Sequence, residues 1–157
     1  MWSEISEEVD LELAQLRRHV VLLSDLRQKV KQGPPDPVEV MALAAFLHAF
    51  YNGVENLFKR IAKRFDRESS RSELWHSQLL NQVSTPNDQR PIVITGELRD
   101  RLRPYLTFRH VFRHAYSHEL KWSKMAPLVA DIEIVLQQLE NQTKAFLSAI
   151  KVMHDHY

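Results

Sequence analysis

Histidine and arginine side chains crowd into one short segment of the chain. The sequence has eight histidines and no cysteine. Three of the histidines, His110, His114 and His118, lie four residues apart. Arg109 directly precedes His110, and Arg113 directly precedes His114. If the segment is one helix, the imidazoles form a row on one face and the guanidinium groups form a parallel row. Protonated together, these side chains would repel one another, which indicates that water, an anion or an acid balances their charge.

Three interpretations fit this segment, and the residue types alone leave them open. The first is a solvated basic face without chemistry, which the aromatic and aliphatic neighbours disfavour. The second is a metal site, which the histidine row would allow for two ligands at a time, although no carboxylate is interleaved and the guanidinium groups oppose a divalent cation. The third is cleavage of a phosphodiester, in which imidazole moves protons near neutral pH and arginine holds the phosphate in a bidentate manner. We favour the third, which requires no metal and no other cofactor.

The same segment resembles a known superfamily. Residues 109–116, Arg-His-Val-Phe-Arg-His-Ala-Tyr, fit the Arg-x4-His-x-Tyr pattern of the HEPN superfamily, and in particular of HepT-like ribonuclease toxins. Residues 51–62, 75–80 and 108–112 are also similar to this group. The resemblance therefore extends from about residue 37 to about residue 150.

The resemblance implies a metal-independent endoribonuclease that is a homodimer, with the motif helices of two copies meeting at the interface. Arg109 would bind and polarise the scissile phosphate, and His114 would act as general acid or base in attack by the ribose 2′-hydroxyl. His110 would orient or stabilise the site. Structured RNA such as tRNA is the expected substrate, with Arg113 and His118 as second-tier RNA contacts. Residues five apart on an ideal helix point about 140° away from each other, so a two-fold axis beside the helix would bring Arg109 and His114 of two copies into one cleft.

The resemblance also implies a protein partner. HepT-like toxins are typically encoded beside a minimal nucleotidyltransferase antitoxin, which neutralises them by transferring AMP to the motif tyrosine, Tyr116 in this sequence. The modification would add negative charge and bulk beside a site built for RNA phosphate. Two alternatives stay open: Tyr116 as a buried residue that packs a helix interface, and the chain as a catalytically silent HEPN-like module that binds and regulates a nucleotidyltransferase.

Composition and charge restrict the class of protein. The chain has 157 residues, a hydrophobic content of 44% and a net charge of +1; its length and hydrophobic content predict a single domain over residues 1–157. The absence of cysteine excludes disulfides, thiolate metal sites and a cysteine nucleophile. The longest apolar stretch, residues 40–47, is far shorter than the roughly 18 residues of a membrane span, so we expect a soluble, cytoplasmic protein without membrane contact. Basic residues outnumber acidic ones in residues 59–71 and 99–124, which indicates a local anionic partner or solvated helix faces.

Helices must position these residues, because apolar residues recur every three or four positions over most of the chain and only three glycines occur. A first helix is expected from Ile5 to Val30, before the breaker at residues 33–35. Asp36-Pro37-Val38-Glu39 has the pattern of a capping box that begins a second, long helix. Gly53 inside that helix indicates a close helix approach. The whole pattern predicts an antiparallel bundle of four to five helices.

The second half of the chain carries the remaining elements. Ser70 and Glu73 have the spacing of a capping box for a short helix. Thr95 is expected to cap a further helix, which Pro104 breaks or kinks, so that residues 105–117 form a motif helix of their own. A last long helix is expected to follow Ser123.

Two sets of polar residues outside the motif are interpreted as mainly structural. Asn52 and Glu55 interrupt the apolar second helix and have the chemistry to support the site, but a packing or capping role is favoured. Trp75-His76 is interpreted as a core residue followed by a surface residue.

Overall fold

The computed structural model describes residues 2–66 and 75–156. The helices are α1 (Trp2–Leu22), α2 (Ser24–Lys29), α3 (Pro37–Phe65), α4 (Trp75–Val83), α5 (Gly96–His114), a 3₁₀ helix η1 (Ser117–Glu119) and α6 (Trp122–Asp155). The expected all-helical class is confirmed, with six α-helices where four to five were expected and no strand within the described ranges. None of the described helices has the length and apolar character needed to cross a membrane.

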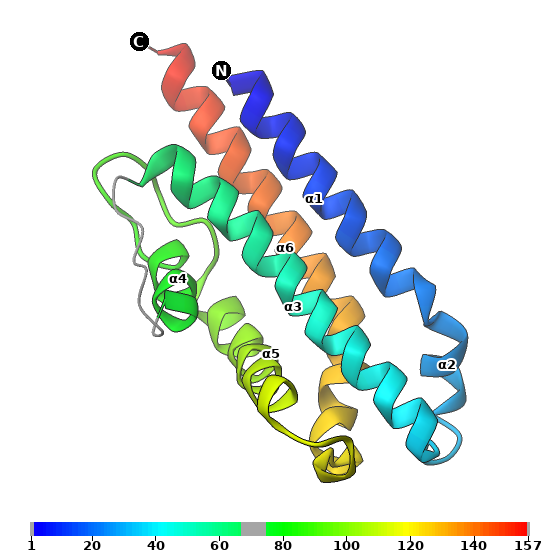
Figure 1. The fold of residues 1–157 in the computed structure, drawn as a ribbon. Coiled ribbons are helices and arrows are strands. Elements are labelled where there is room, and N and C mark those ends of the chain that lie inside the picture. Colours follow the sequence, from blue (N-terminus) through cyan, green and yellow to red (C-terminus); the bar gives the residue numbers. More distant parts are fainter. Residues whose placement is uncertain (1, 67–74, 157) are drawn as a thin grey trace.

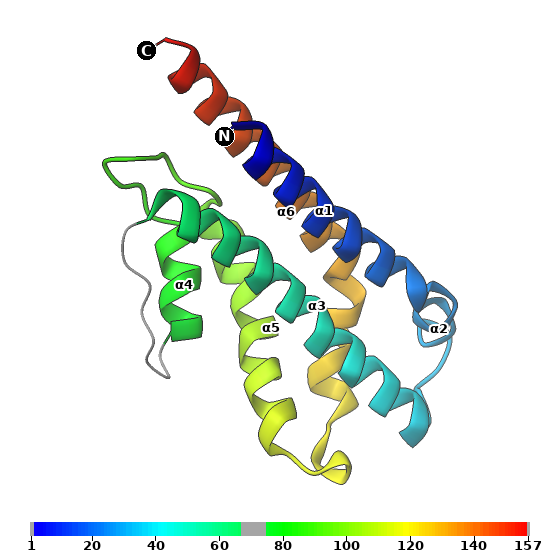
Figure 2. The same cartoon turned by 45° about the horizontal axis from the view of Figure 1, so that its top comes forward.

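Helix α3 occupies the centre of the bundle. Figure 1 and Figure 2 show it between α1 on one side and the pair α4 and α5 on the other, and it packs against α1, α4, α5 and α6. Helix α6 closes the arrangement against α1 and α5. The chain direction alternates from α1 to α3 to α5 to α6, so both chain ends lie at one end of the bundle and the α5–α6 connection lies at the other (Figure 1).

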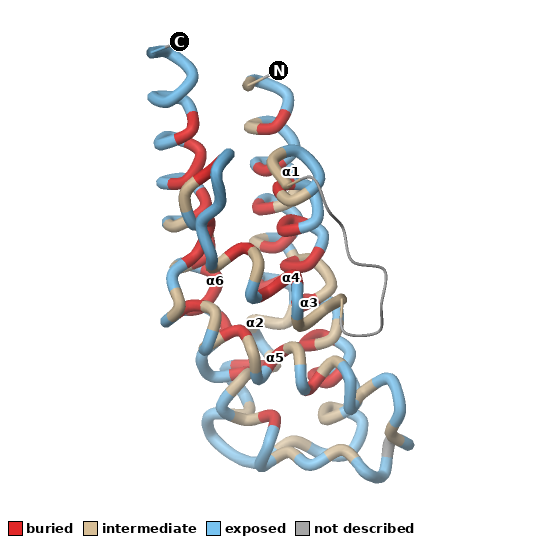
Figure 3. Tube along the Cα trace, turned by 90° about the vertical axis from the view of Figure 1, so that its left-hand side faces the viewer, coloured by how far each residue is buried: buried red, intermediate tan, exposed pale blue. Residues whose placement is uncertain are grey.

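The core follows from the apolar stripes read in the sequence. Buried positions recur along the inner sides of the long helices, as Figure 3 shows. In α1 they are spaced by three and four residues, as the amphipathic pattern requires; they are Ile5, Val9, Leu13, Leu16 and Val20. Removal of these side chains from water stabilises the bundle and fixes the face that α1 turns toward α3 and α6.

Helix α3 begins where the sequence predicts. The Glu39 backbone N–H donates to Asp36 Oδ1 at 2.8 Å, and the Asp36 backbone N–H donates to Glu39 Oε1 at 3.1 Å, so the capping box is complete. The close approach expected at Gly53 is also confirmed, because a Cβ atom at this position would lie 2.6 Å from Leu16 Cδ2. Helix α1 therefore contacts the backbone of α3 at this turn.

The expected single first helix is two helices. The chain turns at Leu23 between α1 and α2. This turn brings the buried Arg27 back onto the end of α1, where its Nη2 donates to Val20 O at 2.7 Å and lies 3.1 Å from Glu133 Oε1. A buried guanidinium needs such partners, and a continuous helix would have pointed this side chain elsewhere.

Pro104 does not break the helix that Thr95 caps, and the prediction of a separate motif helix is wrong. Helix α5 is continuous from Gly96 to His114 with Pro104 inside it, and its first turn is capped by Thr95 Oγ1, which accepts from the Leu98 backbone N–H at 3.2 Å. Proline removes one backbone hydrogen bond at a cost of about 3 kcal/mol. Burial of residues on both sides of it offsets this cost; they are Leu98, Leu102, Tyr105 and Phe108.

The first residues of α4 and α6 were also predicted from the sequence. Residues 70–73, the expected cap of the short helix, lie outside the described residues, and α4 is described from Trp75. Helix α6 was expected to follow Ser123 but begins at Trp122, with Lys121 as its N-cap, so Ser123 lies inside its first turn. Boundaries of this kind commonly shift by one or two residues.

Candidate active site

Three helices bring polar side chains together beside Arg109 of α5. His48, Asn52 and Glu55 lie on one face of α3, because residues at i, i+4 and i+7 share a helix face. His76 comes from the first turn of α4. We call these five residues the Arg109 cluster. They lie where α3 packs against α4 and α5.

The Arg109 guanidinium is fixed at its Nε edge. Its Nε–H donates to Asn52 Oδ1 at 2.6 Å, and the same nitrogen lies 3.4 Å from Glu55 Oε1. The side chain is 13% exposed. Within the described ranges, neither Nη nitrogen forms a hydrogen bond. The Nη groups therefore remain able to donate to a phosphate, whose geometry matches the guanidinium fork.

Glu55 is the buried anion of the cluster. Its side chain is 3% exposed, and its second carboxylate oxygen, Oε2, contacts Nδ1 of His76 in a close ion pair. A carboxylate taken out of water is costly unless cations or hydrogen-bond donors surround it. Arg109 and His76 provide these partners from two different helices.

His48 completes the cluster as a neutral imidazole. Burial lowers the pKa of His48, and the positive charges of Arg109 and Arg113 lower it further. Its Nε2 lies 3.2 Å from the Asn52 side-chain nitrogen, and its ring packs 4.8 Å from the ring of Phe112. With Nε2 accepting from the amide, the proton of His48 is on Nδ1. His48 therefore orients Asn52, whose oxygen faces Arg109.

His110 and His114 lie outside this cluster. Both are exposed, and their ring centroids are 4.7 Å apart. Five residues along a helix correspond to a rotation of about 140°, so His114 lies on a different side of α5 from Arg109. No hydrogen bond or ion pair joins Arg109 to His114 within the described residues of one chain. The structure thus gathers Arg109 with Asn52 and Glu55 and leaves the two motif histidines at the surface.

The predicted row of three histidines on one helix is wrong. Helix α5 ends at His114 because Ala115 adopts an extended conformation, and His118 lies on η1. Tyr116 lies between the two elements and is 74% exposed, with its ring stacked 5.8 Å from that of His118. Within one chain, Tyr116 is therefore not a buried tyrosine that packs between helices. Arg113, also exposed, lies on the last turn of α5.

The described residues contain no group of three histidine, aspartate or glutamate side chains that could hold a metal ion. Two observations explain why the histidine-rich segment does not form one. His118 leaves the helical row, and Glu55, the carboxylate beside Arg109, is engaged by Arg109 and His76.

A hollow of about 570 Å³ lies on another side of α5, against η1 and the start of α6. Its apolar lining includes Phe108 and Val111 from α5 and Leu120 and Leu128 from the chain that follows. Val111 lies between the two exposed motif histidines and is itself 45% exposed.

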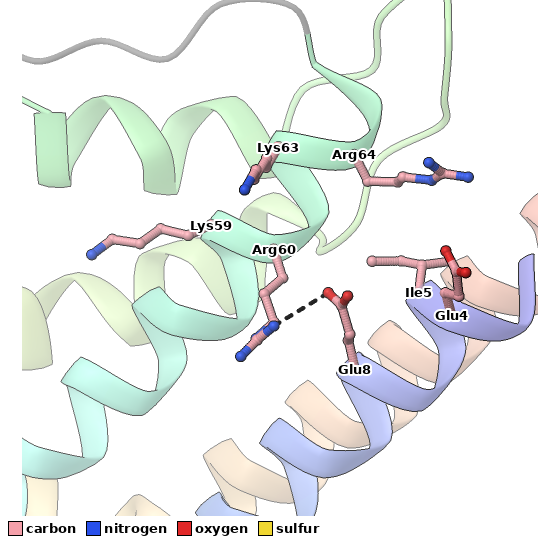
Figure 4. A pocket seen from close by; sticks show the side chains of 7 residues that line it. All are labelled: Glu4, Ile5, Glu8, Lys59, Arg60, Lys63 and Arg64. Atoms are coloured by element: carbon pink, nitrogen blue, oxygen red, sulfur yellow. Dashed lines mark hydrogen bonds and ion pairs between the residues drawn. The ribbon is translucent and has the colours of Figure 1, made fainter. Parts of the chain in front are cut away.

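A second hollow of about 400 Å³ lies between α1 and α3 (Figure 4). Four residues of the basic segment line it: Lys59, Arg60, Lys63 and Arg64. Arg60 points across it toward Glu8, at 3.3 Å, and its Nε lies 2.7 Å from Glu12. Lys59 points away from Glu8 (Figure 4), and its Nζ lies 4.4 Å from the centre of the Trp75 ring. Part of this basic segment is thus neutralised inside the chain.

A family model described as HepT-like protein matches residues 42–150. The chain belongs to the HepT-like family. No curated protein and no solved structure matches it. The matched residues of this HepT-like chain include the whole Arg109 cluster as well as His110, His114 and Tyr116.

Part of this HepT-like site is not evident from the sequence. Asn52 and Glu55 were assigned mainly to packing, and His76 to the surface, yet all three lie in the Arg109 cluster. His48 was not singled out. The available signal was the spacing of His48, Asn52 and Glu55, which places three polar side chains on one face of an otherwise apolar helix. The contribution of α4 could not be read from spacing, because it depends on how the chain folds back.

Proposed function

We propose that this HepT-like protein is the toxin of a toxin–antitoxin pair and acts as a metal-independent endoribonuclease on RNA in the cytoplasm, with tRNA as the expected substrate. The observation that supports this most strongly is the fixed guanidinium of Arg109. Its Nε is held by Asn52 of α3, and Arg109 lies on α5, the helix that also carries the exposed His114. An arginine oriented in advance stabilises developing phosphate charge without reorganisation during the reaction.

The proposed reaction uses the motif residues in distinct roles. Arg109 binds the scissile phosphate and stabilises negative charge on its oxygens. His114 removes the proton of the ribose 2′-hydroxyl or protonates the leaving 5′-oxygen. His110, 4.7 Å away between ring centroids, orients that imidazole or stabilises the site. The bond from the 2′-oxygen to phosphorus forms as the bond to the 5′-oxygen breaks, which leaves a cyclic phosphate and a 5′-hydroxyl.

A homodimer is part of the proposal, because Arg109 and His114 of one chain lie on different sides of α5. A two-fold axis beside α5 would bring Arg109 of one copy toward His114 of the other. The exposed side chains of His110, Val111 and His114 are available for such an interface. Arg113 and His118, which are also exposed, would then contact RNA beside the paired motifs.

The proposed partner is a minimal nucleotidyltransferase antitoxin that transfers AMP to Tyr116. The Tyr116 side chain is 74% exposed and lies in the short connection after α5. Its hydroxyl is therefore accessible to attack the α-phosphate of ATP, with pyrophosphate as the leaving group. The added phosphate would place negative charge next to Arg113 and His114 and repel RNA.

The test is incubation of the purified protein with total tRNA in excess EDTA. His114→Ala is compared in parallel with His154→Ala, which removes an exposed histidine near the C-terminal end of α6. We expect cleavage by the parent and by His154→Ala, and none by His114→Ala, with cyclic phosphate and 5′-hydroxyl ends identified by mass spectrometry. If the folded, unmodified parent cleaves no RNA, the alternative of a silent module that regulates a nucleotidyltransferase is favoured instead.

A further inference from the structure

We infer that Arg109 and His76 of one protomer form a phosphate-binding pair and that Glu55 positions both side chains. The inference rests on the proposed function, because it adds an RNA contact to the same site. His76 is outside the Arg-x4-His-x-Tyr motif and comes from α4.

The carboxylate of Glu55 contacts both members of the pair. One of its oxygens, Oε1, lies 3.4 Å from Arg109 Nε, and the other, Oε2, contacts His76 Nδ1. The buried carboxylate of Glu55, on α3, therefore contacts both Arg109 of α5 and His76 of α4. Because the Glu55 side chain is only 3% exposed, water has little access to its carboxylate, and Arg109 and His76 are its main partners.

Both side chains are held by the nitrogen nearer to their own backbone. Arg109 is held at Nε, which leaves its Nη groups, and His76 is held at Nδ1, which leaves Nε2. In the described part of the chain, these remaining nitrogens form no hydrogen bonds. The His76 side chain is 30% exposed and that of Arg109 is 13% exposed. When His76 is protonated, its Nε2–H and the Arg109 Nη groups are N–H donors with neighbouring anchors and access to solvent, and together they form a binding site for phosphate oxygens.

The charges of the cluster favour an anion. Glu55 contributes one negative charge and Arg109 one positive charge, so a protonated His76 leaves the group with a net positive charge. His48, whose pKa burial and neighbouring arginines lower, adds no charge. Lys59 extends the positive field, because its Nζ lies over the Trp75 ring, which in turn packs 4.7 Å from the His76 ring. A phosphate neutralises the excess charge without displacing Glu55.

The competing explanation is an internal ion-pair group that only stabilises the packing of α3, α4 and α5. The two explanations differ for Glu55→Gln. If the group only stabilises packing, Glu55→Gln that still folds removes a negative charge beside the RNA site and should leave RNA binding unchanged or tighter. Loss of the positioning carboxylate would instead weaken binding, because Arg109 and His76 lose their common anchor.

The first experiment uses inorganic phosphate and needs no ribonuclease activity. At about pH 5.5, where an ordinary histidine is protonated, phosphate is titrated into the protein while side-chain N–H signals are followed by NMR. We expect the signals of Arg109 and His76 to shift with one common dissociation constant, and the shift at Arg109 to weaken in His76→Gln. A shift at neither residue, or at Arg109 alone with no effect of His76→Gln, overturns the inference.

The second experiment, at the same pH as the first, measures binding of a single-stranded RNA whose 2′-hydroxyls are all methylated, so that it cannot be cleaved. We expect His76→Gln and Glu55→Gln each to weaken binding about tenfold, since a charge-assisted hydrogen bond is lost. The salt dependence should also flatten in His76→Gln by about 0.7 in the slope of log K against log salt, the value for one lost phosphate contact on a single strand. A merely structural role would not change this slope.

Matched variants separate the possible failures. His154→Gln and Glu97→Gln remove the same side-chain types from exposed positions and should leave affinity within about twofold. Tighter RNA binding by Glu55→Gln, or an unchanged salt slope in His76→Gln, overturns the inference even if the parent cleaves RNA. Phosphate binding at Arg109 and His76 in a parent that cleaves no RNA would support the pair and contradict the proposed function.

Discussion

At the scale of single residues, the shape of Arg109 matters as much as its charge. Its Nε–H is bound to Asn52 at 2.6 Å, and only the Nη groups remain for substrate. A side chain with one terminal nitrogen cannot place donors at both the Nε and the Nη positions. The roles of anchoring and of phosphate binding are therefore separated within one guanidinium group.

Arg109→Lys should lose at least about 100-fold in kcat/KM on tRNA, the range found when one preorganised donor to a developing oxyanion is removed. The charge is retained, but the single nitrogen of lysine cannot occupy both the Nε position beside Asn52 and the Nη positions that bind the phosphate. Steady-state cleavage assays in EDTA provide the measurement, with Arg18→Lys on the exposed side of α1 as the control. Activity near that of the parent would mean that a point charge is sufficient.

Tyr116→Phe should remain an active ribonuclease but accept no AMP. Only the hydroxyl is removed, and the exposed ring keeps its stacking partner His118. Intact-protein mass spectrometry after incubation with ATP and the partner nucleotidyltransferase measures the modification. AMP found at another residue of this variant would contradict the assignment of Tyr116.

The residue-level predictions from the sequence were strongest where a local pattern carries chemistry. The Arg-x4-His-x-Tyr spacing identified a segment that the family match also covers. The environment of Arg109 could not be predicted in the same way, because Glu55 and His76 come from helices 54 and 33 positions earlier in the sequence. Only tertiary packing decides that they meet.

At the scale of elements, the end of α5 decides which motif residues share a face. The helix stops at His114, so His118 leaves the row and Tyr116 becomes exposed. The amphipathic pattern, the capping box at Asp36 and the cap at Thr95 were sufficient to predict most helix positions. The effect of Pro104 was not predictable from local propensity, because burial on both sides of it keeps α5 continuous.

The link between α3 and α4 depends on an ion pair that is separate from the candidate site. Arg90 Nε lies 2.8 Å from Asp66 Oδ1 and Arg90 Nη2 lies 2.9 Å from Asp66 Oδ2, with both side chains almost fully buried. Burial alone would raise the pKa of Asp66, but hydrogen bonds from Arg90, Gln82 and Asn87 outweigh it and hold the pKa below its usual range. Gln82 lies on α4, so this pair helps to place the helix that carries His76.

Asp66→Asn should lower the free energy of unfolding by about 3 kcal/mol at neutral pH, because it leaves Arg90 buried without its anion. A carboxyl with a lowered folded-state pKa contributes stability above its unfolded pKa of about 3.9, and this contribution is lost as the pH falls toward the folded value. The difference between parent and variant should therefore shrink below about pH 4. Urea unfolding from about pH 7 to pH 3 measures it, with the exposed Asp88→Asn as a control. A difference that does not change with pH would contradict this account.

At the scale of the whole molecule, the proposed site requires two chains. Arg109 belongs to an internal cluster, whereas His114 is exposed on another side of α5. The geometry of one protomer therefore supports a site shared between copies, each of which supplies a different part.

Mixing Arg109→Ala with His114→Ala should restore cleavage although each variant alone is inactive. In a statistical mixture half of the dimers are mixed, and each mixed dimer has one intact site of two, so roughly a quarter of the parent activity is expected. Cleavage is measured after the two variants are unfolded together and refolded, with each variant refolded alone as the control. No recovery, with dimers present by light scattering, would place both residues of a working site in the same chain.

The contact between Gly53 and Leu16 has a consequence for how the protein can be inactivated. Gly53 follows Asn52 directly, so the turn of α3 that touches Arg109 on one side is pressed against α1 on the other. A larger side chain at residue 53 must push α1 away or shift α3, and Asn52 moves with it. If expression of the chain arrests growth, as proposed, surviving cells should carry substitutions at Gly53 and Leu16 as well as in the motif. Escape from toxicity would then arise at positions that no RNA touches.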